Sequence, residues 1–147
     1  MNLDAVIFDI GGTLVAEAPP GTAVGDLVVT PRGDVVAELS VLALSVRIGA
    51  ATDTAVMRAA DVRAVLEPSG IAGVLEVIVT SVDVGAAKPD PSSLRRVMHA
   101  LGVSDPSRVL FVGDRDEDAQ AAAAAGVHYQ PIGDAGPAAA IARWLEA

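Results

Sequence analysis

Residues 5–14, Ala-Val-Ile-Phe-Asp-Ile-Gly-Gly-Thr-Leu, are the stretch that decides the fold. Four apolar residues in a row, with no alternating polar positions, are typical of a strand buried on both faces of a parallel sheet. The run ends at Asp9, and Gly11 and Gly12 then break it. In an open parallel sheet the carboxyl ends of the strands meet at one edge, where ligands bind. Asp9 is therefore predicted to stand beside a functional site.

The rest of the chain alternates short aliphatic runs with helical patterns. Strands are predicted at 46–51, 74–79, 108–112 and 127–132, and helices at 30–45, 53–66, 90–101, 118–125 and 138–146. Two helix starts carry a polar cap followed by proline, at Thr30-Pro31 and at Asp90-Pro91. Strands that alternate with helices through short connections predict an α/β fold in three layers: a mainly parallel five-stranded sheet with helices on both faces.

The 147 residues are predicted to form a single domain, because that length supports one core and no repeat or linker divides it. Hydrophobic residues make up 52% of the chain but aromatic residues only 3%, so the core is expected to consist mainly of Ala, Val, Leu and Ile. Residues 15–29 contain Pro and Gly without a clear period and are predicted to be a flap or loop excursion.

Composition also narrows the class of function. The absence of cysteine excludes disulfides and thiolate chemistry. A net charge of −9 with scattered basic residues argues against nucleic-acid binding. The N-terminus lacks the basic flank of a signal peptide, and no apolar run approaches the roughly 18–20 residues that span a bilayer. We therefore expect a cytoplasmic protein without a membrane partner.

Polar residues of related chemistry follow three of the predicted strands: Asp9, Thr52 and Asp114. Each alone would most simply be the first residue of a loop. Because parallel strands end at one edge, the three are expected to converge. Three residues of these types at such positions together predict one site.

Four motifs along the chain resemble those of the haloacid dehalogenase (HAD) superfamily. Asp9–Leu14 is similar to the first motif, residues 48–53 to the second, Lys-Pro-Asp-Pro at 88–91 to the third, and Val-Gly-Asp-Arg-Asp-Glu-Asp at 112–118 to the fourth. All four occur in order between residues 5 and 118. The resemblance implies the Rossmann-like HAD fold. The connections between Thr13 and Thr52, and between Asp53 and Lys88, leave no room for a large cap domain, so a small capless member is expected.

For the reaction, the resemblance implies a hydrolase that transfers a phosphoryl group to Asp9 as an aspartyl-phosphate. It assigns Thr52 and Lys88 as further catalytic residues, and Gly12, Thr52, Asp53 and Lys88 as contacts of the substrate. Lys88 is the only lysine among ten basic residues, which favours a requirement for a compact charge at that position. The expected substrate is a phosphorylated small molecule or a phosphoprotein, and an oligomer or partner domain could act as a lid.

For the cofactor, the resemblance implies Mg²⁺. The implied ligands are Asp9, the main-chain carbonyl of Gly11, and Asp114, with Asp118 in support. These are the hard oxygen donors that Mg²⁺ prefers. A cation is expected on chemical grounds as well, since an anionic nucleophile and an anionic phosphate repel each other.

One position departs from the family pattern. Gly11 stands where HAD phosphatases carry a second aspartate, which protonates the leaving group and then activates water. Such a general acid/base contributes on the order of 10²–10⁴ in rate. Two hypotheses follow: a weak phosphohydrolase limited to substrates with good leaving groups, or a degenerate, non-catalytic HAD domain that binds metal, phosphate or a partner protein. Gly11 favours the second, and the other retained motif residues favour the first.

Overall fold

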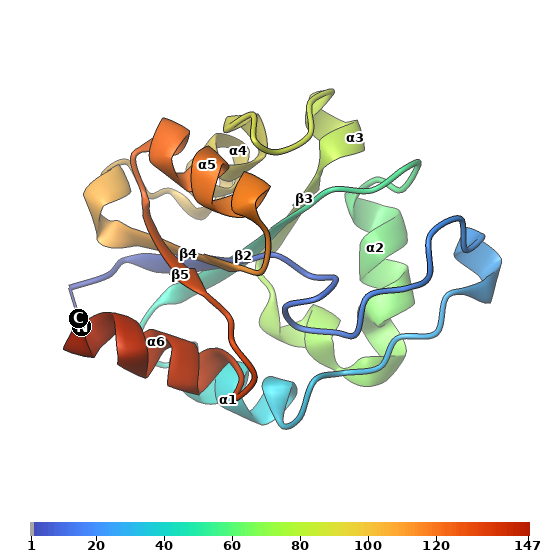
Figure 1. Cartoon of the computed structure of the whole chain (residues 1–147), viewed down its shortest axis with the longest axis horizontal. Coiled ribbons are helices and arrows are strands. Elements are labelled where there is room, and N and C mark those ends of the chain that lie inside the picture. The colour runs from blue at the N-terminus through green and yellow to red at the C-terminus, as the bar shows by residue number, and fades with distance from the viewer. Residues whose placement is uncertain (1) are drawn as a thin grey trace.

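The computed structural model describes residues 2–147, and a five-stranded sheet forms its centre (Figure 1). The strands are β1 (Ala5–Phe8), β2 (Arg47–Thr52), β3 (Val77–Thr80), β4 (Val109–Gly113) and β5 (His128–Pro131). Their order is β3-β2-β1-β4-β5, and every neighbouring pair is parallel. The chain thus winds outward first to one side of β1 and then to the other. That reversal beside the central strand is the usual position of a ligand site in such sheets.

Helices cover both faces of the sheet and complete the predicted three layers. They are α1 (Val35–Leu42), α2 (Ala59–Leu66), α3 (Ser81–Val84), α4 (Ser92–Leu101), α5 (Asp116–Ala125) and α6 (Pro137–Glu146), with short 3₁₀ turns at Val24–Asp26, Glu67–Ser69, Ile71–Val74 and Pro106–Arg108. In Figure 1 the sheet lies between α1 and α6 on one side and α4 and α5 on the other. The α/β fold expected from the sequence is confirmed.

Successive side chains of β1 point to opposite faces of the sheet, and both faces are buried. Val6 and Phe8 belong to the core cluster under α1, α2 and α6, whereas Ala5 and Ile7 belong to the cluster under α4 and α5. All four side chains have no exposed surface. Small residues let the second helical layer lie close: a Cβ on Gly49 would approach Val97 Cγ1 to 2.5 Å. The central strand is therefore enclosed by both helical layers, and Asp9 follows directly from it.

Several element boundaries differ from those predicted. The helix expected to begin at Thr30-Pro31 begins at Val35, because Pro31 instead forms an isolated antiparallel bridge with Val15. The helix expected directly after Asp53 begins at Ala59. The short helix α3 was not predicted; Thr80 Oγ1 caps it by accepting from the Asp83 backbone N–H at 3.1 Å. In each case local hydrogen bonds determine where the helix begins, and the spacing of apolar residues does not.

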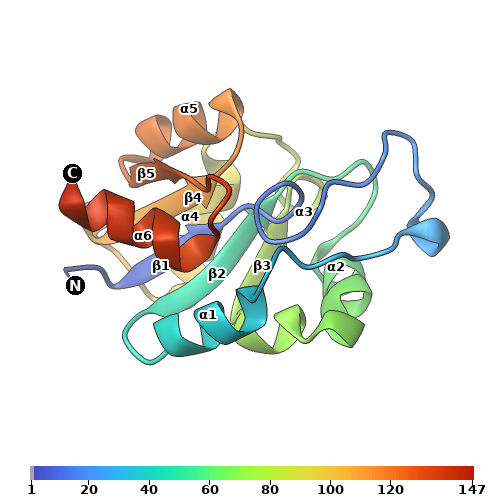
Figure 2. The ribbon, with the colours of Figure 1, turned by 60° about the horizontal axis from the view of Figure 1, so that its bottom comes forward.

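The connection between β1 and α1 contains only the turn Val24–Asp26, and its role as a flap stays a prediction. It runs out beyond α2 in both Figure 1 and Figure 2. Within residues 2–147, no cap domain interrupts the fold. In the same part of the chain, no helix combines the length and the apolarity that crossing a bilayer would require.

Candidate active site

The strand ends bring the predicted residues to one edge of the sheet. Phe8 pairs in register with Ala50 of β2 and Val112 of β4, so the three strands end at nearly the same level. Asp9 follows β1 directly, Thr52 is the last residue of β2, and Asp114 follows β4. The convergence expected from the sequence is therefore present in the structure.

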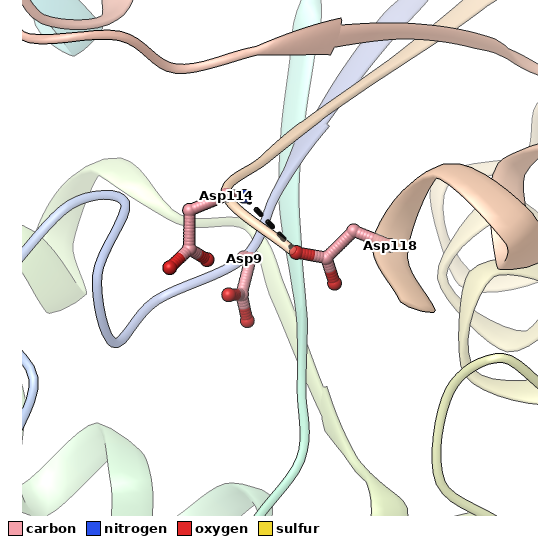
Figure 3. A group of neighbouring side chains, drawn as sticks. All are labelled: Asp9, Asp114 and Asp118. Carbon is pink, nitrogen blue, oxygen red and sulfur yellow. Dashed lines mark hydrogen bonds between the residues drawn. The ribbon is translucent and has the colours of Figure 1, made fainter. Parts of the chain in front are cut away.

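Three carboxylates meet at this edge (Figure 3). Asp9, Asp114 and Asp118 each offer an oxygen, and the three oxygens lie within 4.8 Å of one another. Asp9 is 6% exposed and Asp118 only 1%, while Asp114 lies at the surface. Carboxylates this close repel one another unless positive charge lies among them. Their hard oxygen donors fit a divalent cation such as Mg²⁺.

Two glycines make room for this cluster. Gly12 adopts a φ of +80°, and a Cβ at this position would collide with Asp114 Oδ2. A Cβ on Gly113 would lie 2.5 Å from Asp118 Oδ2. In both cases the space that a side chain would take is occupied by a carboxylate of the cluster. Glycine at positions 12 and 113 is therefore what allows the carboxylates of Asp114 and Asp118 to take these places.

Lys88 supplies positive charge within the cluster. Its Nζ lies 2.7 Å from Asp118 Oδ1 and 3.1 Å from Asp9 Oδ1, and it donates to the Ala51 carbonyl at 3.1 Å. The Lys88 side chain is 3% exposed. Burial by itself lowers the pKa of Lys88, but the nearby carboxylates of Asp9, Asp118 and Asp53 outweigh burial and raise the pKa above its ordinary value. The ammonium group is therefore held in its charged form.

The nucleophile proposed by the motif lies in an unusual electrostatic setting. Burial raises the pKa of the Asp9 carboxyl from 3.8 to about 7. Lys88 opposes that rise in pKa, while Asp118 and Asp114 add to it. A carboxylate must be ionised to attack phosphorus. Asp9 consequently needs more positive charge than Lys88 provides, which a cation among the three acids would supply.

Asp118 also organises the backbone around the cluster. Its Oδ2 accepts hydrogen bonds from the backbone N–H groups of Asp114 and Arg115, both at 3.1 Å. Asp118 thereby caps the start of α5 and holds the loop that carries Asp114 (Figure 3). Each carboxylate oxygen has two lone pairs, so these bonds leave Asp118 able to ligate a cation.

A cavity of about 280 Å³ opens over these groups. Asp9, Gly11, Thr52, Lys88 and Asp118 are among the residues that line it. Thr52 is buried, with 7% of its surface exposed, and it lines the same cavity as Asp9 and Lys88. This arrangement can hold a phosphate beside a carboxylate nucleophile.

Two of the predicted substrate contacts have additional structural tasks. Asp53 lines the cavity, and its Oδ1 also accepts a hydrogen bond from the Lys88 backbone N–H at 3.2 Å, so that it holds the lysine's loop. Gly12 borders a separate hollow beside Asp114. Their contacts with a substrate stay predictions.

The sequence reasoning missed three residues of the site. Arg32 donates to the Gly12 carbonyl at 2.7 Å and to the Gly133 carbonyl at 3.1 Å, which ties the Asp9 loop to the loop after β5. Glu17 and Arg115 form an ion pair, and both line the cavity. These residues lie outside the helices and strands and are joined over long sequence separations, so no period or spacing could have indicated them.

Comparison with known proteins agrees with the motif assignment. The profile of the haloacid dehalogenase-like hydrolases matches residues 22–126. The plasmid form of phosphoglycolate phosphatase from Cupriavidus necator is 40% identical over 76 residues, which cover 48% of this chain and 32% of that protein. The chain thus matches only about a third of the length of this curated relative.

Two solved structures resemble the chain over most of its length. An uncharacterized protein from Listeria monocytogenes has 26% identity and a TM-score of 0.76, covering 89% of this chain and 79% of that one. A HAD-superfamily hydrolase of subfamily IA from Geobacter sulfurreducens has 20% identity and a TM-score of 0.69, covering 86% and 88% of the two chains. The second likeness is one of fold alone.

Proposed function

The chain belongs to the haloacid dehalogenase-like hydrolase family, and from this premise we propose that it is a Mg²⁺-dependent phosphohydrolase acting through an aspartyl-phosphate on Asp9. One observation carries the proposal. Asp9 stands buried at the end of the central strand, within 3.1 Å of Lys88 and among the carboxylates of Asp114 and Asp118. Relatives that are phosphoglycolate phosphatases support a phosphorylated small molecule as the class of substrate.

In the first proposed step a carboxylate oxygen of Asp9 attacks phosphorus. The bond from phosphorus to the leaving oxygen breaks, and its electron pair departs with that oxygen. Lys88 keeps a positive charge against Asp9 and the transferred group, and the Thr52 hydroxyl donates a hydrogen bond to a phosphate oxygen. Water then attacks the phosphorus of the aspartyl-phosphate, and the bond from phosphorus to the Asp9 oxygen breaks. The released phosphate takes up the proton that water loses, and the Asp9 carboxylate is restored.

The proposed cation would be held by Asp9, Asp114, the Gly11 carbonyl and Asp118. When bound, Mg²⁺ supplies positive charge between the two anions and stabilises the charge of the transferring group. The buried position of Asp9 makes this charge necessary, since burial raises the pKa of its carboxyl to about 7. We expect the protein to work in the cytoplasm, with neither nucleic acid nor membrane as a partner.

Gly11 restricts which substrates can react. It has no side chain with which to protonate the departing oxygen, so the leaving group must be stable as an anion. Acyl phosphates and aryl phosphates meet this condition, and alkyl phosphates do not. Packing does not require this glycine, because no heavy atom of residues 2–147, apart from the glycine and its chain neighbours, lies within 4 Å of a Cβ placed at position 11.

A substrate series of falling leaving-group pKa tests the proposal. With Mg²⁺, acyl phosphate should be hydrolysed fastest, aryl phosphate more slowly and alkyl phosphate least. Asp9→Asn should abolish turnover, and Gly11→Asp should raise alkyl phosphate hydrolysis by about 10²-fold or more. Asp26→Asn, which removes an exposed acid of the β1–α1 connection, is the matched control and should change nothing.

The alternative is a domain that binds metal or phosphate without turnover, and Gly11 is the observation that favours it. It predicts a different result in the same experiment. If neither the wild-type protein nor Gly11→Asp hydrolyses any of the three phosphate classes, the phosphohydrolase proposal is wrong.

A further inference from the structure

A second cavity, of about 370 Å³, adjoins the phosphate cavity. It lies between the β1–α1 connection and α2, which Figure 2 shows side by side. Gly11, Glu17, Thr52 and Asp53 line both cavities. The two spaces therefore share a border, and a molecule with its phosphate near Asp9 could extend into the second.

The lining of the second cavity is mainly aliphatic. The contributing side chains from the β1–α1 connection and from the neighbourhood of α2 are Val15, Leu27, Val28, Val29, Met57, Val62, Val65 and Leu66. Its two charged residues, Glu17 and Asp53, are both acids, and within residues 2–147 no lysine, arginine or histidine lines it. An anionic group placed there would lose water without gaining a counter-charge. An uncharged apolar group would gain by burial.

The cations of the neighbouring phosphate cavity are already paired. Lys88 contacts Asp9 and Asp118, and Arg115 forms its ion pair with Glu17. A second anionic group on the substrate would have to compete with these carboxylates for the same cations. The charge distribution thus discriminates against substrates that carry a carboxylate besides their phosphate.

Gly11 lies at the border between the two cavities. Because the space at its Cβ position is open, no side chain of residue 11 stands between the phosphate cavity and the aliphatic one. The volume of the aliphatic cavity lies at the small end of ligand pockets, which run from about 300 to 1,000 Å³. It therefore suits a short chain or a single ring.

We propose that this cavity binds the leaving group of the substrate, and that the leaving group carries an uncharged apolar body rather than a second anionic group. The inference rests on the proposed function and specifies its substrate class: acyl or aryl phosphates with a short apolar chain or ring. Transfer of phosphorus to Asp9 breaks the bond to the leaving oxygen. The leaving group departs with that electron pair as a carboxylate or phenolate, its apolar body in the cavity. Phosphoglycolate, with its carboxylate, is a poor match.

Three acyl phosphates with Mg²⁺ test this directly. Acetyl phosphate has almost no apolar body, hexanoyl phosphate has a short chain, and glutaryl phosphate ends its chain in a carboxylate. Hexanoyl phosphate should exceed acetyl phosphate in kcat/KM by about tenfold or more, from the burial of its methylene groups. Glutaryl phosphate should fall to or below acetyl phosphate.

Substitutions at Val28 place charge on the cavity wall. Val28 lines the cavity and is 81% exposed, so its replacement removes no core packing. Val28→Asp should raise KM for hexanoyl phosphate and lower kcat/KM about tenfold, and Val28→Lys should shift preference toward glutaryl phosphate. Val24 belongs to the same connection, is 41% exposed and is not among the residues that line the cavity, so Val24→Asp is the matched control and should change neither.

The outcomes separate this inference from the proposed function. If acetyl phosphate is hydrolysed but hexanoyl and glutaryl phosphates are equivalent, the apolar subsite is wrong while the phosphohydrolase stands. If no acyl phosphate is hydrolysed, titration with hexylphosphonate and methylphosphonate tests the cavity without turnover. Hexylphosphonate should then bind at least about tenfold more tightly to the wild-type protein, and this preference should vanish in Val28→Asp. Equal affinities would overturn the inference.

Discussion

Replacing Lys88 with methionine should destabilise the metal-free protein strongly. The lysine contacts Asp9 and Asp118, and the three side chains are 3%, 9% and 2% exposed, respectively. Removing one partner of a buried ion pair typically costs about 3–5 kcal/mol, because the remaining charge is left buried without compensation. Methionine keeps much of the volume of lysine, so the loss of stability reports the charge rather than a cavity.

The loss should depend on pH, and its sign follows from Asp9. The folded protein raises the pKa of Asp9 from 3.8 to about 7, so the stabilisation from its bound proton is complete below about 3.8 and is lost as pH rises through 7. Lys88 lowers that pKa, and its removal lets Asp9 keep the proton to higher pH. At pH 6 the variant can neutralise Asp9 by protonation. At pH 8 it does so less completely, and the free energy of unfolding should fall further.

Urea unfolding in EDTA at pH 6 and pH 8 measures both effects, since free Mg²⁺ would replace part of the missing charge. Arg47→Met is the control. It breaks the Arg47–Glu76 ion pair, whose side chains are 54% and 44% exposed, and should cost no more than about 1 kcal/mol at either pH. The reasoning is refuted if Lys88→Met costs no more than this control at pH 8, or if its cost is the same at both pH values.

Two further predictions concern the acid cluster. Mg²⁺ should raise the melting temperature more at pH 8 than at pH 6, because the cation competes with the proton on Asp9. Asp114→Asn should remove most of this increase. If Mg²⁺ leaves the melting temperature unchanged, the proposed metal site is wrong. Gly12→Ala should cost at least about 1–2 kcal/mol in urea unfolding, because φ is +80° and the added methyl collides with Asp114. Gly25→Ala, in open space on the β1–α1 connection, should stay within about 0.5 kcal/mol of wild type, and equal effects would contradict the steric argument.

The strands and the converging strand ends were predictable because their signals are local. Residues 5–8 are apolar at every position, which is what burial on both faces requires, and the polar residue that follows must lie at the sheet edge. Helix starts were less predictable. Thr30-Pro31 has the residue types of a cap, but the bridge between Val15 and Pro31 competes for the same backbone and delays the helix to Val35.

The assembly of the site depends on contacts that no local pattern encodes. Lys88 lies 79 residues from Asp9 in sequence, and only the motif resemblance indicated that the two would meet. The aliphatic cavity likewise joins residues 15–29, predicted as an irregular loop, to α2. The sequence shows that Leu27, Val28 and Val29 are apolar but not what they lie against. Their common cavity appears only in the folded chain.

The absent side chain at position 11 has two consequences, and both favour the same substrates. In the proposed reaction, the lack of a proton donor requires the departing oxygen to be stable as an anion, which disfavours alkyl phosphates on chemical grounds. Without a Cβ, residue 11 places no side chain between the phosphate cavity and the aliphatic cavity, so a leaving group with an apolar body would meet none there. Acyl and aryl phosphates with a short apolar chain or ring satisfy both conditions. Phosphoglycolate satisfies neither, because its leaving group is an alkoxide that carries a carboxylate. If Gly11 were simply the remnant of a lost activity, the electrostatics of the neighbouring cavity would have no reason to agree with the chemistry at the phosphorus.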